Sequence, residues 1–167
     1  TAYRRQRQMC IRDRPETMFG DQAIAVHPKD KRYKKLIGLN AKIPFTDKYI
    51  PIIADPYVDK DFGTGCLKIT PGHDFNDYEL GIKHGLEPMN ILNPDGTLNT
   101  ETPAPFSGMD RFDARREIIK SLKDIQMLER IEPHKLSIPR AERSDTILEP
   151  YLTDQWYLNT DLSLIHI

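Results

Sequence analysis

The chain has 167 residues, of which 38% are hydrophobic and 29% are charged, and its formal net charge is −1. That length is enough for one globular domain with its own core, and the near-neutral charge excludes a polybasic nucleic-acid-binding arm, though not a local basic patch. No apolar stretch approaches the length of a membrane span, and the two cysteines form neither a disulfide framework nor a zinc spacing. We therefore expect a cytoplasmic protein that binds neither a membrane nor DNA.

Both ends of the chain resemble a sequencing adaptor. Residues 4–13 and 162–167 back-translate into the two ends of one transposase-based adaptor, so residues 1–13 and 162–167 are expected to be foreign. Residues 1–13 carry four arginines and one aspartate, and without them the net charge of −1 becomes −4. The native part is predicted to begin at Arg14, whose codon shares two bases with the adaptor, and to be a piece of a longer protein.

Strands dominate the first elements of the native part. Alternating branched residues predict a strand over residues 22–26. Residues 48–55 are apolar and β-branched, and Pro51 restricts that strand to a sheet edge or a bulge. Between these two strands, residues 31–38 have the pattern of a short amphipathic helix that ends at Gly38.

A strand followed by a helix comes next. Residues 66–70 predict a strand, and residues 74–84 predict a helix with Asp74 as its N-cap and Gly85 beyond its end. Asp74 and Asp77 are three residues apart and share a face of the first turn, where free N–H groups and the helix dipole favour ionised carboxylates.

The second half of the chain mixes turns and helices. The turn signal at residues 93–96 predicts a hairpin between residues 89–92 and 97–99, and residues 111–128 predict an amphipathic helix. Another strand is expected over residues 134–139. Irregular strands, proline-rich turns and few helices favour an α+β or barrel-like domain over regular βαβ alternation.

The two aspartates are the strongest candidate for a functional site. One can cap the helix while the other faces outward to hold a cation such as a substrate ammonium, or both can simply cap the helix. Lys68 and Thr70 alternate onto one face of the preceding strand. Together with Asp74 and Asp77, they predict a polar pocket for a small zwitterionic or ester substrate.

Other chemistries fit this stretch less well. The pair His73–Asp74 is typical of metal phosphohydrolases, but His84 lies about a helix length away and Cys66 does not complete a zinc spacing. There is no nucleophile elbow, and the glycines at 63–65 are not followed by the residues of a phosphate loop. We therefore expect no metal site.

Four ordered segments resemble the valyl-tRNA synthetase family of class I aminoacyl-tRNA synthetases. They are RPETMFGDQAIAVHP, FGTGCLKITPGHDFNDYELGIKHGL, MNILNPDGTLN and ILEPYLTDQWYL, which begin at residues 14, 62, 89 and 147. The resemblance implies that residues 14–145 are a partial editing domain, with a β-barrel core, peripheral helices and a truncated N-terminal side. It also implies that residues 146–161 return toward a catalytic domain.

The resemblance further implies an editing hydrolase that removes threonine from mischarged Thr-tRNA(Val). The parent enzyme would be valine–tRNA ligase, which attaches valine to tRNA(Val) using ATP. Asp77 would anchor the aminoacyl ammonium, and Asp74, Lys68 and Thr70 would line the pocket that recognises the threonine hydroxyl. No side-chain nucleophile is implied, because a positioned water attacks the ester.

Three more residues take roles from the resemblance. Thr17 would limit the size of the pocket, Phe62 would contact the terminal adenosine, and Arg14 would contact the substrate or the tRNA end. The implied partner is the aminoacylated 3′ end of tRNA(Val). No cofactor is expected in this chain, because the ATP-binding motifs are absent and ATP and Mg would belong to the catalytic domain of the parent. The alternatives are a non-catalytic tRNA-end-binding fragment, or an isoleucyl-tRNA synthetase editing domain that acts on Val-tRNA(Ile).

Overall fold

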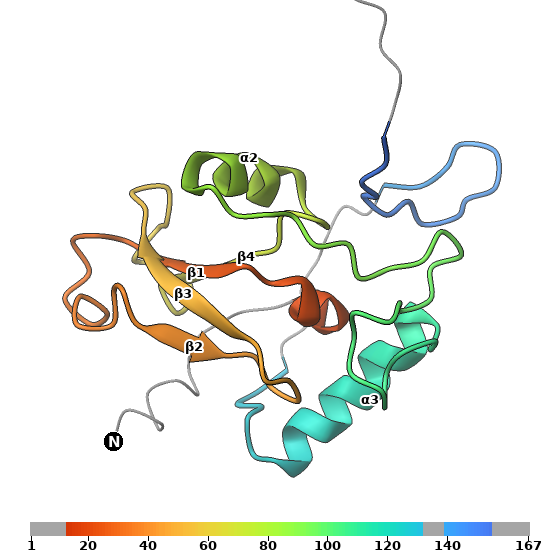
Figure 1. Cartoon of the computed structure of the whole chain (residues 1–167), viewed down its shortest axis with the longest axis horizontal. Coiled ribbons are helices and arrows are strands. Elements are labelled where there is room, and N and C mark those ends of the chain that lie inside the picture. Colours follow the sequence, from red (N-terminus) through yellow and green to blue (C-terminus); the bar gives the residue numbers. More distant parts are fainter. Residues whose placement is uncertain (1–12, 132–138, 155–167) are drawn as a thin grey trace, which may run out of the picture.

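The computed structural model describes residues 13–131 and 139–154. These contain the 3-10 helix η2 (Pro15–Gly20), the strands β1 (Ala23–Val26), β2 (Asn40–Lys42), β3 (Tyr49–Ala54) and β4 (Cys66–Ile69), and the helices α2 (Phe75–His84) and α3 (Arg111–Asp124) (Figure 1). None of the helices in these two ranges is long and apolar enough to cross a membrane. Most of both adaptor-like ends, and the strand expected at residues 134–139, lie outside the described residues.

The four strands form one open, mixed sheet in the order β2-β3-β1-β4. β1 pairs in parallel with β3 and antiparallel with β4, and β2 pairs antiparallel with β3. The α+β class is confirmed, but the expected β-barrel core is wrong for the described residues, since β2 and β4 remain at opposite edges. The physical reason is that four strands of three to six residues are too few to close a barrel.

Pro51 lies in an interior strand, so its expected place at a sheet edge or a bulge is wrong. Its strand, β3, runs between β2 and β1. The N–H of Ile52 donates to Leu39 on the β2 side, which turns the nitrogen of Pro51 toward β1. Pairing with β1 begins only at Ile52, opposite Ile24, so the missing N–H of the proline removes no bond from that ladder.

The helix predicted from its caps is confirmed. Asp74 Oδ1 accepts from the N–H groups of Asn76 and Asp77, and Gly85 ends α2 in the left-handed conformation with φ of 64°. The next predicted helix is also present, although it ends at Asp124 rather than at residue 128.

The helix expected over residues 31–38 is absent, because these residues form successive turns. Lys31 and Arg32 would place two cations at the positive end of a helix dipole, and so short a helix has little intrinsic stability. Gly38 does end the segment, with φ of +85°. The hairpin expected around residues 93–96 is reduced to its turn and a single bridge between Leu92 and Leu98.

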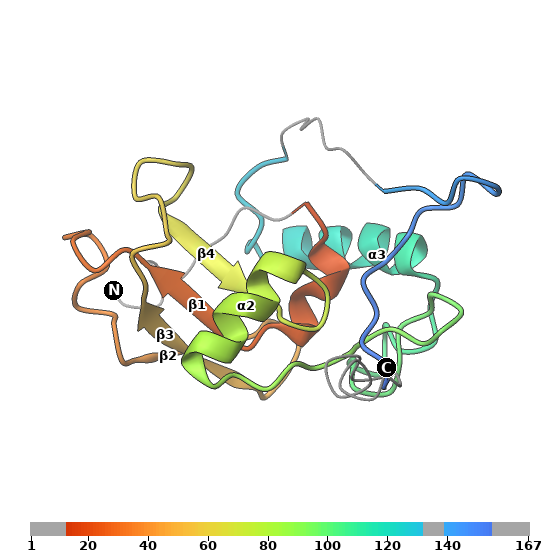
Figure 2. The ribbon, with the colours of Figure 1, turned by 90° about the horizontal axis from the view of Figure 1, so that it is seen from above.

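Hydrophobic residues cover both faces of the sheet, and β1 is buried throughout. Ile24 and Val26 of β1 pack into the larger cluster, which also contains residues of η2 and α3. Ala23 and Ala25 face the smaller cluster, where Leu80 brings in α2. Figures 1 and 2 show α2 over one face of the sheet, and α3 lying beside η2. The start of α2 therefore lies against the end of β4.

Candidate functional site

Asp77 points inward from the first turn of α2 toward the end of β4. Its side chain is buried, and its Oδ2 accepts from the Nζ of Lys68 at 2.7 Å and from the N–H of Thr70 at 2.9 Å. An outward-facing carboxylate was one of the sequence-based alternatives, and it is wrong for Asp77. The cation beside Asp77 in this structure is the chain's own Lys68, whose side chain is 17% exposed.

Asp74 acts as the helix cap. Its Oδ1 holds the N–H groups of Asn76 and Asp77, at 2.9 and 3.1 Å. The two aspartates therefore have different roles: Asp74 caps the helix as expected, whereas Asp77 faces inward rather than outward. Asp74 fixes the start of α2 and thereby the direction in which Asp77 points.

Burial dominates the electrostatics of Asp77. It raises the pKa of the carboxyl above its ordinary value, while the charge and the hydrogen bond of Lys68 and the N–H of Thr70 act in the opposite direction. The ammonium of Lys68 at 2.7 Å compensates the charge of this buried carboxylate, which would be costly to leave unpaired.

Thr70 connects the site to a second buried acid. Its side chain is completely buried, and its hydroxyl donates to Oδ1 of Asp21 at 2.7 Å. Asp21 follows η2 directly and is itself buried. Sequence reasoning missed Asp21, although an acidic residue between η2 and a wholly apolar strand was a usable signal. The side chains of Lys68 and Thr70 thus donate to separate carboxylates within one polar cluster.

η2 forms the neighbouring wall, and two of the predicted residues lie in it or at its N-cap. Thr17 is buried, and its hydroxyl donates to the carbonyl of Arg14 at 2.9 Å. Arg14 forms an ion pair with Glu149 and donates to the carbonyl of His73 at 3.4 Å. A Cβ on Gly20 would lie 3.3 Å from Thr70, so the end of η2 packs closely against the polar cluster.

His73 fixes the turn between β4 and α2. Its ring is buried, and its Nε2 accepts from the N–H of Ile91 at 3.0 Å. Burial, with the positive charges of Arg14 and Lys68, lowers the pKa of His73 to about 4, so the ring is neutral at physiological pH. Within the described residues, no group of three or more His, Cys, Asp or Glu side chains could hold a metal ion. The structure therefore gives His73 a packing role.

Phe62 lies away from this cluster. It is in the loop that precedes β4, whereas Thr70 follows the other end of the same strand. Its side chain is 69% exposed. The structure thus brings together Arg14, Thr17, Lys68, Thr70, Asp74 and Asp77, and leaves Phe62 at the opposite end of β4.

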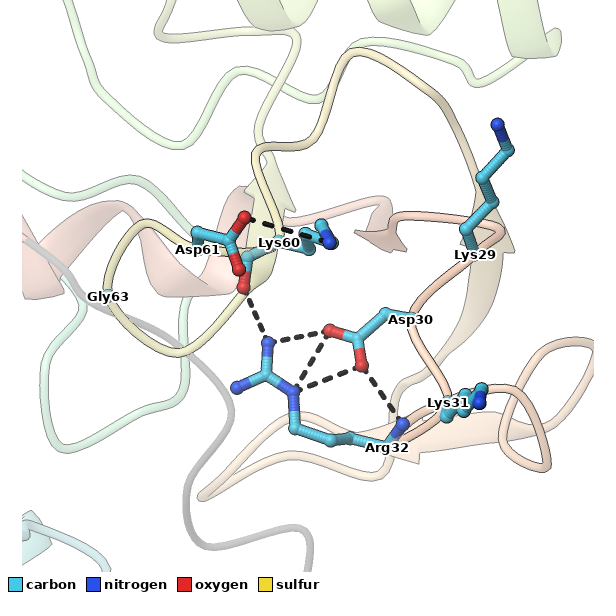
Figure 3. Close-up of a pocket in the computed structure, with 7 residues that line it drawn as sticks. All are labelled: Lys29, Asp30, Lys31, Arg32, Lys60, Asp61 and Gly63. Carbon is cyan, nitrogen blue, oxygen red and sulfur yellow. Dashed lines mark hydrogen bonds and ion pairs between the residues drawn. The ribbon is translucent and has the colours of Figure 1, made fainter.

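Two cavities lie outside the polar cluster. One of about 430 Å³ is formed by the loops around residues 29–32 and 60–63 (Figure 3). The other, of about 340 Å³, lies beside α2 and is lined by residues such as Tyr57 and Leu80. Asp77 lines neither of them.

Comparison with known proteins identifies the domain. The family described as leucyl-tRNA synthetase, editing domain, matches residues 21–111, which include β1 to β4, α2 and the start of α3. The chain belongs to this family of synthetase editing domains. The crystal structure of GlLeuRS-CP1 matches with a TM-score of 0.55 and 15% identity over 75% of this chain and 83% of that chain, a likeness of fold.

The relatives of this editing domain include valine–tRNA ligases. The enzyme of Francisella tularensis is 55% identical over 149 residues, which are 89% of this chain and 16% of the ligase. The enzyme of Legionella pneumophila (strain Lens) is 56% identical over 147 residues, 88% of this chain and 16% of the ligase. The resemblance seen in the sequence motifs is confirmed, and the chain spans about one sixth of the length of these ligases.

Proposed function

We propose that this chain is the post-transfer editing part of a valine–tRNA ligase, and that it hydrolyses Thr-tRNA(Val). The observation that carries the proposal is the buried polar cluster of Asp77, Lys68, Thr70 and Asp21 in a domain of the synthetase editing family. An apolar synthetic pocket discriminates weakly against an isostere that bears a hydroxyl, and valyl-tRNA synthetase facing threonine is the usual illustration of this limit. A second, polar site removes the error.

In this proposal, the aminoacyl ammonium shares Asp77 with Lys68. The carboxylate remains buried and is already oriented by the N–H of Thr70, so little reorganisation is needed when a second cation arrives. The threonine hydroxyl is recognised by the polar groups around Thr70 and Asp21, while Thr17 on η2 restricts the size of the site. Valine has no hydroxyl to pair with these buried groups and is therefore rejected.

The chemical step is the addition of water to the ester carbonyl. The bond between the carbonyl carbon and the ribose oxygen breaks, and the products are free threonine and tRNA with a free terminal hydroxyl. In this proposal the chain needs no cofactor, and its partner is the aminoacylated 3′ end of tRNA(Val). ATP and Mg would serve the catalytic domain of the full ligase, which activates valine.

Deacylation of three charged tRNAs tests the proposal. The substrates are Thr and Val on the valine tRNA and Val on the isoleucine tRNA, each incubated with the whole chain. We expect selective loss of Thr and a decrease of about 30-fold in Asp77→Asn, since a charge-assisted hydrogen bond contributes roughly 2 kcal/mol. Glu79→Gln, an exposed acid on the same helix, is the matched control and should hydrolyse at the unaltered rate. Preference for Val on the isoleucine tRNA would overturn the assignment of the pocket.

A second candidate is a module that binds the tRNA end without hydrolysis. It is favoured by the burial of Asp77, whose Oδ2 already accepts two hydrogen bonds within the chain. Binding of the charged tRNA with no turnover by a folded chain would support this candidate. Turnover that depends on Asp77 would reject it.

A further inference from the structure

A basic cavity lies at the end of the sheet opposite the polar cluster. It has a volume of about 430 Å³ and is lined by four cationic side chains, Lys29, Lys31, Arg32 and Lys60, and by two acids, Asp30 and Asp61 (Figure 3). The cations come from two loops, one after β1 and one before β4. Because β1 and β4 are antiparallel, these loops meet at the same end of the sheet.

Arg32 is held in place within this cavity. Its Nε and Nη2 donate to both carboxylate oxygens of Asp30, and Nη2 also donates to the carbonyl of Lys60 at 2.6 Å. Asp30 is buried, and its hydrogen bond with Arg32 keeps the pKa of the carboxyl below its ordinary value. Among the described residues, Nη1 of Arg32 has no hydrogen-bond partner, and Figure 3 shows it pointing away from Asp30. An oriented guanidinium with donors left over is suited to a phosphate.

The remaining lysines give the cavity an excess of positive charge. Asp30 is neutralised by Arg32, and Asp61 lies 3.7 Å from the ammonium of Lys60. Lys29 and Lys31 have no ion-pair partner in the part of the chain that the structure describes. Two positive charges are therefore available to an anionic ligand.

An exposed aromatic residue lies in the same loop as part of the cavity lining. Phe62 is flanked in the sequence by Asp61 and Gly63, which both line the cavity, and its side chain is 69% exposed. A cationic groove beside an exposed aromatic face is the combination with which proteins bind single-stranded nucleic acid, since phosphates contact the cations and a base stacks on the ring. The four-residue strand β4 lies between this cavity and the polar cluster, and it spans roughly 13 Å at about 3.3 Å per residue.

We propose that this cavity binds backbone phosphates of single-stranded RNA upstream of the aminoacylated nucleotide. The assignment of that RNA to a tRNA end rests on the proposed function. Binding itself does not require hydrolysis, and it can be measured with uncharged RNA. The probe is a fluorescent RNA hairpin with a single-stranded 3′ end, titrated with the whole chain at several salt concentrations.

The variant pair Lys29→Gln and Lys31→Gln tests the two available charges. Each phosphate contact with a single strand contributes about 0.7 to the slope of log K against log salt, so the slope should fall by about 1.4 in magnitude. This decrease in slope means that the double variant should bind the RNA roughly tenfold more weakly than the parent chain at about 200 mM salt. Lys34→Gln with Lys35→Gln is the matched control, because both lysines are exposed on the same loop but neither lines the cavity. Asp61→Asn should strengthen binding by removing a negative charge from the rim.

RNA binding by these variants is measured independently of the hydrolysis assay. RNA binding that the Lys29 and Lys31 variant weakens more than the control supports the cavity, whether or not the chain deacylates any tRNA. Equal losses in the two lysine pairs, or no binding by the folded chain, would overturn it. Loss of deacylation in Asp77→Asn with unchanged RNA binding would show that the two ends of the sheet act independently.

Discussion

The buried imidazole of His73 makes the stability of the domain depend on pH. Its pKa of about 4 lies below the ordinary value of 6.5, mainly because burial disfavours the imidazolium. Between these values the unfolded chain binds a proton that the folded chain does not, so this contribution to stability is complete above pH 6.5 and is lost as the pH falls toward 4. At about 1.36 kcal/mol per pKa unit, the free energy of unfolding decreases by about 3 kcal/mol between about pH 7 and pH 4.

Urea unfolding of the whole chain, followed by circular dichroism over this pH range, measures the effect. His73→Gln retains an acceptor for the N–H of Ile91 but cannot titrate, so its stability should depend less on pH, by up to about 1.4 kcal/mol per pH unit. His27→Gln, in the loop after β1, retains His73 and should keep the pH dependence of the parent chain. The variants are compared by the slope of the free energy of unfolding against pH, so a loss of stability that is the same at every pH does not affect the comparison. Parallel curves for the parent chain and His73→Gln would refute the reasoning.

Three further substitutions test other contacts by chemical denaturation. Hydrogen bonds to the buried carboxylate of Asp55 outweigh the effect of burial and lower its pKa from 3.8 to about 2. Asp55→Asn should therefore decrease the free energy of unfolding by about 2 kcal/mol near pH 7. This difference should disappear as the pH falls from 3.8 to about 2. Glu16→Gln breaks a buried two-bond pair with Arg115 and should cost about 2 kcal/mol. Gly72→Ala places a Cβ 2.2 Å from the carbonyl oxygen of Met89 and should also cost about 2 kcal/mol. If any of the three variants is as stable as the parent chain, the contribution assigned to that contact is wrong.

Local signals in the sequence predicted α2 correctly. Asp74 as N-cap and Gly85 as C-cap act within one helical turn of the ends that they define, so their effect can be read from neighbouring residues. The same local rules failed at Pro51, because its tolerance depends on where the pairing of β3 with β1 begins. Strand order is a property of distant segments, and no local pattern reported that β3 lies inside the sheet.

The candidate site was predicted only in part, because contacts between sequence neighbours follow from local patterns and contacts between distant segments do not. Lys68, Thr70 and Asp77 are close in the sequence, and the turn that joins β4 to α2 brings them together. Asp21 joins them from 49 residues away through the hydroxyl of Thr70, a contact that no spacing rule anticipates. The resemblance gave Phe62 a contact with the terminal adenosine, which stays a prediction, and the structure places Phe62 before β4 while Thr70 follows the other end of that strand.

The polar cluster and the basic cavity lie at opposite ends of the antiparallel pair β1–β4, and the proposal gives each end its own role. The end of β4 that leads to Thr70 carries buried, mutually paired charges, which suit recognition of one amino acid through a few fixed hydrogen bonds. The end that begins at Cys66 carries exposed cations and Phe62, which suit a flexible polyanion because solvated charges tolerate variation in its path. In the proposed complex, an RNA strand held by the cations would have its terminal nucleotide near the buried cluster, because β1 and β4 are paired along their length. Specificity and attachment would then depend on separate residues, and substitutions at one end should leave the other end intact.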